Sequence, residues 1–156
     1  MWFNCNTMLS DRANDTTLIV LRRDIVKQCV SYLVRNDFVN ITIPWQWYLH
    51  PSYTKKIINP SSFAKFEGLS APLWYCYEMA ARQEYYLQRF SSDIKMVETS
   101  LEDVTTDDGA KKFWNELGFS GECKLPPVKN ANKRQANTQL NDRVREITGS
   151  INVDMR

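Results

Sequence analysis

The sequence lacks the residues and motifs on which many enzymes and metal sites depend. It contains one histidine, His50, which excludes most metal sites and every acid–base pair built on two histidines. Its four cysteines form no CxxC pair, and the motifs GxGxxG, GxxxxGK[ST], GxSxG and HExxH do not occur. We therefore expect no cofactor, no metal ion and no enzyme of a class that such motifs identify.

Long apolar runs and an export signal are also missing. No stretch approaches the roughly 18 consecutive apolar residues that cross a membrane, and the N-terminus has no charged region followed by an apolar one. We expect a protein that contacts no membrane, lies in the cytoplasm or within a virus particle, and is not secreted through a signal peptide. Its cysteines are then expected to remain reduced thiols.

A strong excess of charge of either sign is missing too. Twenty Lys and Arg against eighteen Asp and Glu give a net charge of +2, which indicates no partner by itself. Hydrophobic residues make up 43% of the 156 residues and charged residues 24%, both close to the globular average. The chain therefore has the composition and length of one ordinary folded domain.

The composition changes once along the chain. All nineteen aromatic residues lie at or before Phe119, whereas residues 124–156 carry seven Lys or Arg against three Asp or Glu, a net charge of +4. A Pro-Pro pair at 126–127 and the polar stretch after it indicate an extended linker, because such a segment buries too little apolar area to offset its ordering entropy. We predict a compact globular body, 1–119, and a polar, basic C-terminal arm, 120–156.

Within the body, the patterns predict an α+β fold that is mainly helical. Apolar residues at helical spacing predict a helix over 16–35, although the β-branched run at its start keeps an alternative open: a short strand before a helix that begins near Asp24. Alternation over 39–49 predicts a half-buried strand or hairpin. Because proline cannot donate to a sheet ladder, this strand is either an edge strand or breaks at Pro44.

A central aromatic-rich helix is predicted over 71–90, with Ser70 as its cap. Two shorter helices are expected after it. One starts at Ser91 or Ser92 and continues to Val104, and the other starts at Thr105 or Thr106 and ends before Gly118. The side chains expected to be substantially buried are Trp74, Tyr77, Leu87, Phe90, Trp114 and Leu117.

The arm contains one candidate helix, near 138–148. Leu140, Val144 and Ile147 repeat at i, i+4 and i+7, which places them on one face. A helix of about ten residues is marginal alone in water, so this face needs a surface to cover it. That surface is either the body of the same chain or a neighbouring molecule, and on the second alternative these three residues bind a partner.

Other candidate site residues each have an ordinary structural explanation. His50 is expected to pack or to donate a hydrogen bond, and the carboxylates Glu67, Glu78 and Glu84 are expected to be solvated rather than catalytic. Basic side chains can neutralise phosphates without a fold of their own. The candidates for phosphate contacts are Lys55, Lys56, Lys129, Lys133 and Arg134.

These observations favour a non-enzymatic structural or interaction subunit of a larger assembly, which contacts neighbouring protein subunits through its C-terminal arm. By analogy of architecture alone, a viral or phage particle is one setting for such a chain. One alternative is a small intracellular nucleic-acid-binding or regulatory protein that uses the basic tail. A second is an enzyme without a recognisable motif.

Overall fold

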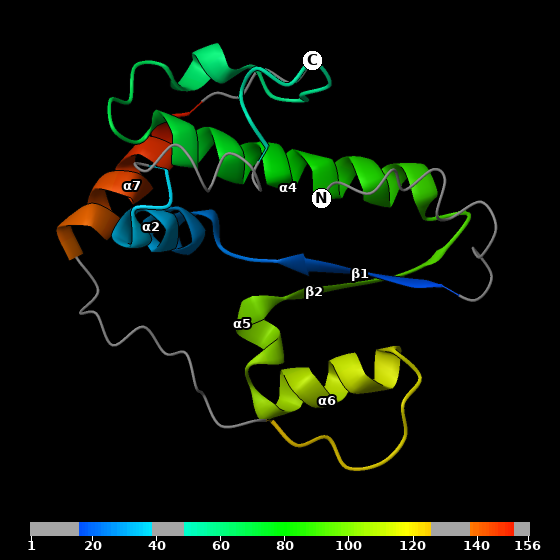
Figure 1. Cartoon of the computed structure of the whole chain (residues 1–156). Helices are drawn as coiled ribbons and strands as arrows, with labels where there is room; N and C mark the ends of the chain where they lie inside the picture. Colours follow the sequence, from blue (N-terminus) through cyan, green and yellow to red (C-terminus); the bar gives the residue numbers. More distant parts are fainter. Residues whose placement is uncertain (1–15, 39–48, 126–137, 152–156) are drawn as a thin grey trace. The chain divides into compact units, whose positions relative to one another are not determined.

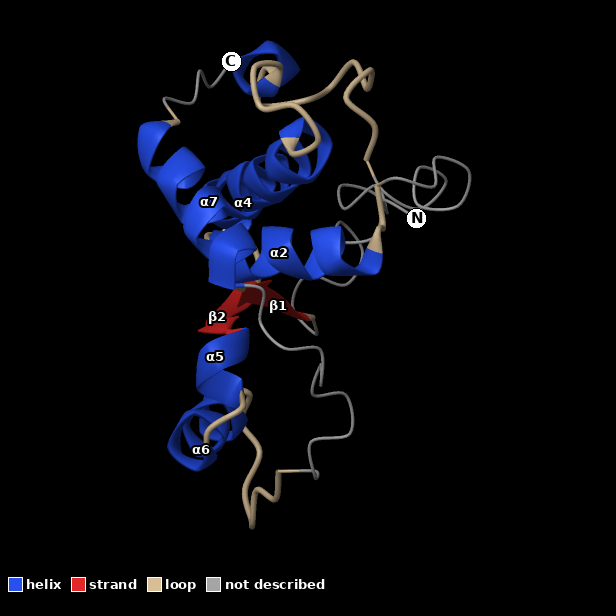
Figure 2. Ribbon diagram, turned by 90° about the vertical axis from the view of Figure 1, so that its left-hand side faces the viewer, coloured by secondary structure: helices blue, strands red, loops and turns tan. Residues whose placement is uncertain are grey.

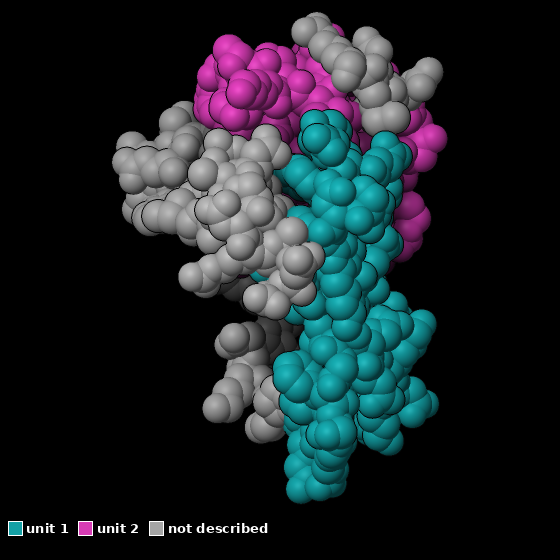
Figure 3. All heavy atoms as spheres, turned by 90° about the vertical axis from the view of Figure 1, so that its right-hand side faces the viewer, with its two compact units in different colours: residues 1–23, 83–134 teal, residues 24–82, 135–156 magenta. Residues whose placement is uncertain are grey.

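The computed structural model describes residues 16–38, 49–125 and 138–151 (Figure 1). Two compact units divide the chain (Figure 3): unit 1 is residues 1–23 with 83–134, and unit 2 is residues 24–82 with 135–156. The elements of unit 1 are β1 (Thr17–Arg22), β2 (Lys95–Ser100), α5 (Leu101–Val104) and α6 (Asp107–Glu116). Those of unit 2 are α2 (Ile25–Arg35), a 3₁₀ turn η2 (Pro60–Phe63) and α7 (Thr138–Ser150). Helix α4 (Ser70–Phe90) belongs to unit 2 as far as Arg82 and to unit 1 from Gln83.

The architecture is mixed α and β and mainly helical, as predicted. The two units differ from the expected division into a body, 1–119, and an arm, 120–156, because α7 groups with residues 24–82. Among the residues that the structure describes, no helix has both the length and the apolar character that crossing a bilayer requires.

The continuous helix predicted over 16–35 is wrong, and the alternative with a short strand is correct. Residues Thr17–Arg22 form β1, and α2 begins only at Ile25. Asp24 separates the two elements, since its side chain accepts a hydrogen bond from the backbone N–H of Lys27 at 2.8 Å and so caps the helix. The β-branched residues before it adopt the extended conformation that suits them and pair with β2.

The helix predicted from Ser91 to Val104 is also wrong over most of its length. Residues Lys95–Ser100 form β2, which runs parallel to β1 in a register that pairs Thr17 with Lys95. Only the end of the segment is helical, because the Ser100 hydroxyl accepts from the Asp103 N–H at 3.0 Å and starts α5.

The prediction of α6 is confirmed in detail. The Thr106 hydroxyl accepts from the Gly109 N–H at 3.1 Å, and Gly118 follows the helix with a φ of 88°, which glycine adopts without steric cost. Helix α4 spans the predicted residues. Trp74 and Phe90 are buried as expected, whereas the other four side chains expected in the core are half-buried: Tyr77, Leu87, Trp114 and Leu117.

Unit 2 has a core built by α2, α4, α7 and the connection before α4. Helix α7 packs against α2 (Figure 2). Two cysteines, Cys29 and Cys76, are buried there outside any disulfide, and their thiols pack as small apolar groups. The strand predicted over 39–49 falls on residues outside the described ranges except for Leu49, which is buried in the same core. The buried members are Cys29, Val30, Leu49, Ile58, Phe63, Leu69, Leu73, Trp74, Tyr75, Cys76 and Val144.

Two helical glycines are expected to respond oppositely to alanine. A Cβ at Gly109 would lie 2.1 Å from the backbone oxygen of Asp103, whereas a Cβ at Gly149 meets nothing within 4 Å. Alanine normally stabilises a helix by up to about 1 kcal/mol relative to glycine. Gly109→Ala should therefore lower the free energy of unfolding by roughly 1–3 kcal/mol, an overpacking cost. Chemical denaturation of Gly109→Ala and of Gly149→Ala measures the change in the free energy of unfolding. Equal changes in the two variants would contradict the packing at Gly109.

Candidate interaction sites

The C-terminal helix α7 places its apolar face on the core of unit 2. Val144 is fully buried, and Leu140 and Ile147 pack against the same cluster of buried side chains. A hydrogen bond adds to this contact, because the Tyr77 hydroxyl donates to the backbone oxygen of Thr148 at 3.4 Å. The helical spacing thus identified the right face.

Of the two surfaces considered for this face, the structure shows the chain's own. A side chain with no exposed area contacts no other molecule in this conformation, so Val144 is not available to a neighbour while α7 is docked. The physical reason is proximity, since a covalently attached helix meets its own chain at high effective concentration. We call the surface of α2, α4 and the connection before α4 that α7 covers the groove of unit 2. A role for Leu140, Val144 and Ile147 towards a partner therefore requires α7 to leave this groove.

Tyr77 lies within this core with a perturbed hydroxyl. Burial raises the pKa of the Tyr77 hydroxyl above its usual value of 10.0, and the nearby thiols of Cys76 and Cys29 raise it further. The hydroxyl therefore remains protonated at neutral pH and acts as a hydrogen-bond donor. Its role is to join α4 to α7.

Glu78 has a structural role that the sequence did not reveal. Its carboxylate is fully buried and accepts hydrogen bonds from the backbone N–H groups of Ile57, at 2.9 and 3.0 Å, and of Ile58, at 2.7 Å. The guanidinium of Arg82 donates to the same carboxylate at 2.8 Å and to the backbone oxygen of Lys55 at 2.6 Å. Trp74 donates its ring N–H to the Ile58 oxygen at 3.0 Å. Together these bonds attach the extended segment 55–58 to α4.

The other candidate acid–base groups also serve local structure. Nδ1 of His50 accepts the Ser52 N–H at 3.1 Å and lies 2.7 Å from the Ser52 hydroxyl. The Arg22 guanidinium lies 2.6 Å from the carboxylates of both Glu84 and Glu98. Burial lowers the pKa of Arg22, but its hydrogen bonds and attraction to these carboxylates outweigh burial and raise it above the usual value. Glu67 is exposed.

The predicted phosphate contacts are only partly within the described residues. Lys55 is exposed, and Lys56 donates to the backbone oxygen of Tyr53 at 3.4 Å. The tail residues Lys129, Lys133 and Arg134 lie outside the described ranges. Phosphate contacts by these five basic side chains stay a prediction.

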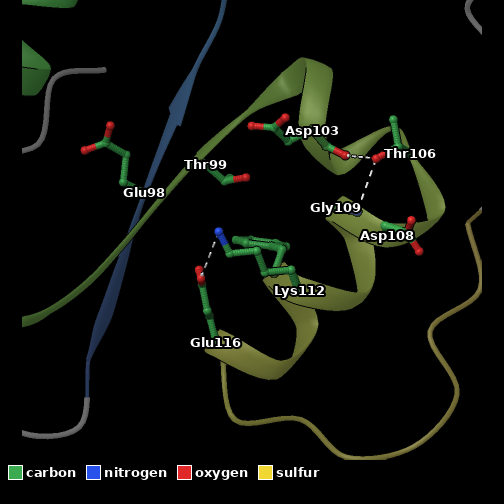
Figure 4. Close-up of a pocket in the computed structure, with 9 residues that line it drawn as sticks. Glu98, Thr99, Asp103, Thr106, Asp108, Gly109, Lys112 and Glu116 are labelled. Carbon is green, nitrogen blue, oxygen red and sulfur yellow. Dashed lines mark hydrogen bonds and ion pairs between the residues drawn. The ribbon is translucent and has the colours of Figure 1, made fainter.

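A pocket of about 330 Å³ lies in unit 1 between β2, α5 and α6 (Figure 4). The carboxylates that line it are those of Glu98, Asp103, Asp108 and Glu116. The Lys112 ammonium lies 3.9 Å from the Glu116 carboxylate. The Thr106 hydroxyl donates to the backbone oxygen of Asp103 and accepts from the Gly109 N–H. In the described part of the chain, no group of three or more His, Cys, Asp or Glu is placed to hold a metal ion. The pocket is an acidic surface that belongs to the α5–α6 turn.

Glu78 and Glu84 provide a matched test of the buried network. Glu78→Gln removes the buried negative charge that pairs with Arg82, and its amide NH₂ then faces either the Arg82 guanidinium or the Ile58 N–H, so we expect a loss of about 3–5 kcal/mol in the free energy of unfolding. Glu84→Gln removes an exposed partner of Arg22, and its loss should be below about 1 kcal/mol. Urea denaturation of both variants measures the two losses. Similar losses would show that Glu78 does not hold the 55–58 segment.

Comparisons of the chain with known protein families, with curated proteins and with solved structures found no match. The interpretation of function therefore depends on the geometry of the described residues. Two features carry it: the docked helix α7 and the surface of the two-stranded sheet.

Proposed function

We propose that the protein is a non-enzymatic structural or interaction subunit of a larger assembly and that its partners are other protein subunits. The observation that carries this proposal is the apolar face of β1. Ile19 and Leu21 are each 46% exposed, although both side chains are large and aliphatic. Parallel sheets normally have both faces covered, so an uncovered apolar strand favours an intermolecular contact.

The exposure follows from how unit 1 covers its sheet. Val20 points to the opposite face from Ile19 and Leu21 and is buried, so β1 has one covered face and one open face. Val97 pairs with Ile19 in register and is 5% exposed. Helices α5 and α6 pack against β2. On this face the side chain of β2 is thus buried, whereas those of β1 are exposed.

A neighbouring subunit that supplies an extended apolar segment suits this face best. Among the described residues the sheet has two strands, which is fewer than a sheet usually needs for independent stability. An added strand would bring backbone hydrogen bonds in the plane of the sheet, and its own apolar side chains would pack beside Ile19 and Leu21 on the same face. The sequence gives no other signal for this site, because the run Thr17–Arg22 is equally compatible with a helix.

The proposal also includes the kind of assembly and a contact made by the C-terminal arm. A viral or phage particle is the kind of assembly that uses small subunits with terminal arms, and the C-terminal arm is the second contact with neighbouring subunits. Such a contact requires α7 to leave the core of unit 2, where it is docked in this structure, and residues 117–137 are its covalent connection to α6. The structural use of Glu78 and of His50 supports a role without catalysis.

The double variant Ile19→Thr with Leu21→Thr tests the proposal. Threonine keeps the strand propensity but removes much of the apolar area, so association should weaken by about tenfold or more, which is about 1.4 kcal/mol. The measurement is the particle mass of the protein isolated from its source, by light scattering, against the 18.3 kDa of the free chain. Tyr85→Thr is the control, because Tyr85 is 53% exposed in the same unit but lies on α4.

The expected result is a wild-type particle much heavier than one chain, a control that assembles equally, and a double variant that is largely free yet folded by circular dichroism. A wild-type protein that is isolated as a free chain contradicts the proposal. So does a double variant that assembles like the wild type. Retention on nucleic acid that falls steeply with salt would favour the alternative function.

A further inference from the structure

The groove that α7 fills is made entirely by residues far from it in sequence. The side chains around Val144 come from α2, α4 and the connection before α4, all within residues 24–82. The last element before α7 is α6, which ends at Glu116 and belongs to unit 1. Nothing but residues 117–137 connects α7 covalently to the rest of the chain, so the groove and its occupant are separate parts.

The contacts of α7 in this groove include side-chain packing and a hydrogen bond. Val144 has no exposed area, Leu140 and Ile147 pack beside it, and the backbone oxygen of Thr148 accepts the Tyr77 hydroxyl. Each of these contacts is made by α7 itself and does not depend on which chain carries it. A second copy of this chain therefore presents the one helix known to fit the groove.

We propose that α7 exchanges between two copies of this chain, so that each copy's α7 completes the other copy's core. This inference rests on the proposed role as an assembly subunit and names one of its partners. The closed and exchanged forms bury the same side chains and differ mainly in the path and closure entropy of the connection.

The connection is long enough to permit both forms. Residues 117–137 number 21 and can span up to about 70 Å when extended. The described part of it, 117–125, contains turns and bends without helix or strand. A connection of this length keeps α7 at an effective concentration of roughly millimolar near its own groove, so exchange is favoured by crowding of subunits or by a shorter connection.

Isotope-filtered NMR on the full wild-type chain reads the exchange directly. Equal amounts of ¹³C,¹⁵N-labelled and unlabelled protein are mixed, unfolded and refolded together at high concentration. The experiment then detects only contacts between a labelled and an unlabelled chain. We expect such contacts between the Tyr77 ring and Thr148 in a species of twice the 18.3 kDa chain mass.

Connection-length variants provide the second arm of the test. Deletion of residues 129–134 shortens the connection by six residues, and replacement of the same six by Gly and Ser preserves its length while removing the same charges. The deletion should raise the dimer fraction several-fold at equal concentration. The replacement should leave it like the wild type.

The outcomes separate this inference from the proposed function. A dimer in which the Tyr77 to Thr148 contact is found only within one chain overturns the exchange but leaves an assembly role standing. A chain that stays monomeric at every concentration, even after the deletion, also overturns the exchange. The assembly role itself is tested separately, by the mass of the particle from the source and by the double variant of β1.

Discussion

The core of unit 2 depends on one side chain that arrives from the far end of the sequence. Val144 is fully buried among residues of α2 and α4, and burial of one such side chain is worth about 1.5–3 kcal/mol. Helix α7 has 13 residues and would be marginal alone, so it forms because the groove covers its apolar face. Helix and groove therefore stabilise each other, which makes the C-terminal segment part of the fold and also the element best suited to join two chains.

A buried carboxylate completes the other side of this core. The extended segment 55–58 has backbone N–H groups that no helix or strand satisfies, and Glu78 accepts two of them inside the protein. Arg82 balances the charge, which a buried carboxylate requires. The same pair positions Tyr53, because the Arg82 guanidinium lies 5.5 Å from the centre of its ring. Groups that looked like acid–base candidates thus hold the chain in place.

The elements that local patterns could identify are the ones with local signals. Thr106 and Gly118 mark the two ends of α6, and the spacing of Leu140, Val144 and Ile147 identifies α7. The β-branched run of β1 indicated a strand only as an alternative, and β2 had no such signal, because Thr17 pairs with Lys95 across about half of the chain. The spacing of Val97 and Leu101 imitates a helix, and only the pairing with β1 selects the strand.

The candidate sites likewise divide into features that local sequence patterns identify and features that only the fold reveals. Helical spacing shows that the apolar face of α7 needs a surface to cover it. The spacing does not show whether that surface belongs to the same chain or to a neighbouring molecule, since either one covers the face equally well. Glu78 was interpreted as solvated because its partners lie about twenty residues away on a segment with no periodic pattern. The exposure of Ile19 and Leu21 depends on which face of β1 the rest of the chain covers, which only the fold determines.

Native-state hydrogen exchange of the full chain tests the central claim, that α7 and residues 24–82 form one cooperative core. The amides of α7 around Val144 should open with the same free energy as those around Cys29 in α2 and Cys76 in α4, to within about tenfold in protection. Protection of the α7 amides that is several orders of magnitude weaker than that of α2 and α4 would contradict the account, because α7 would then be a loosely attached tail and not a part of this core.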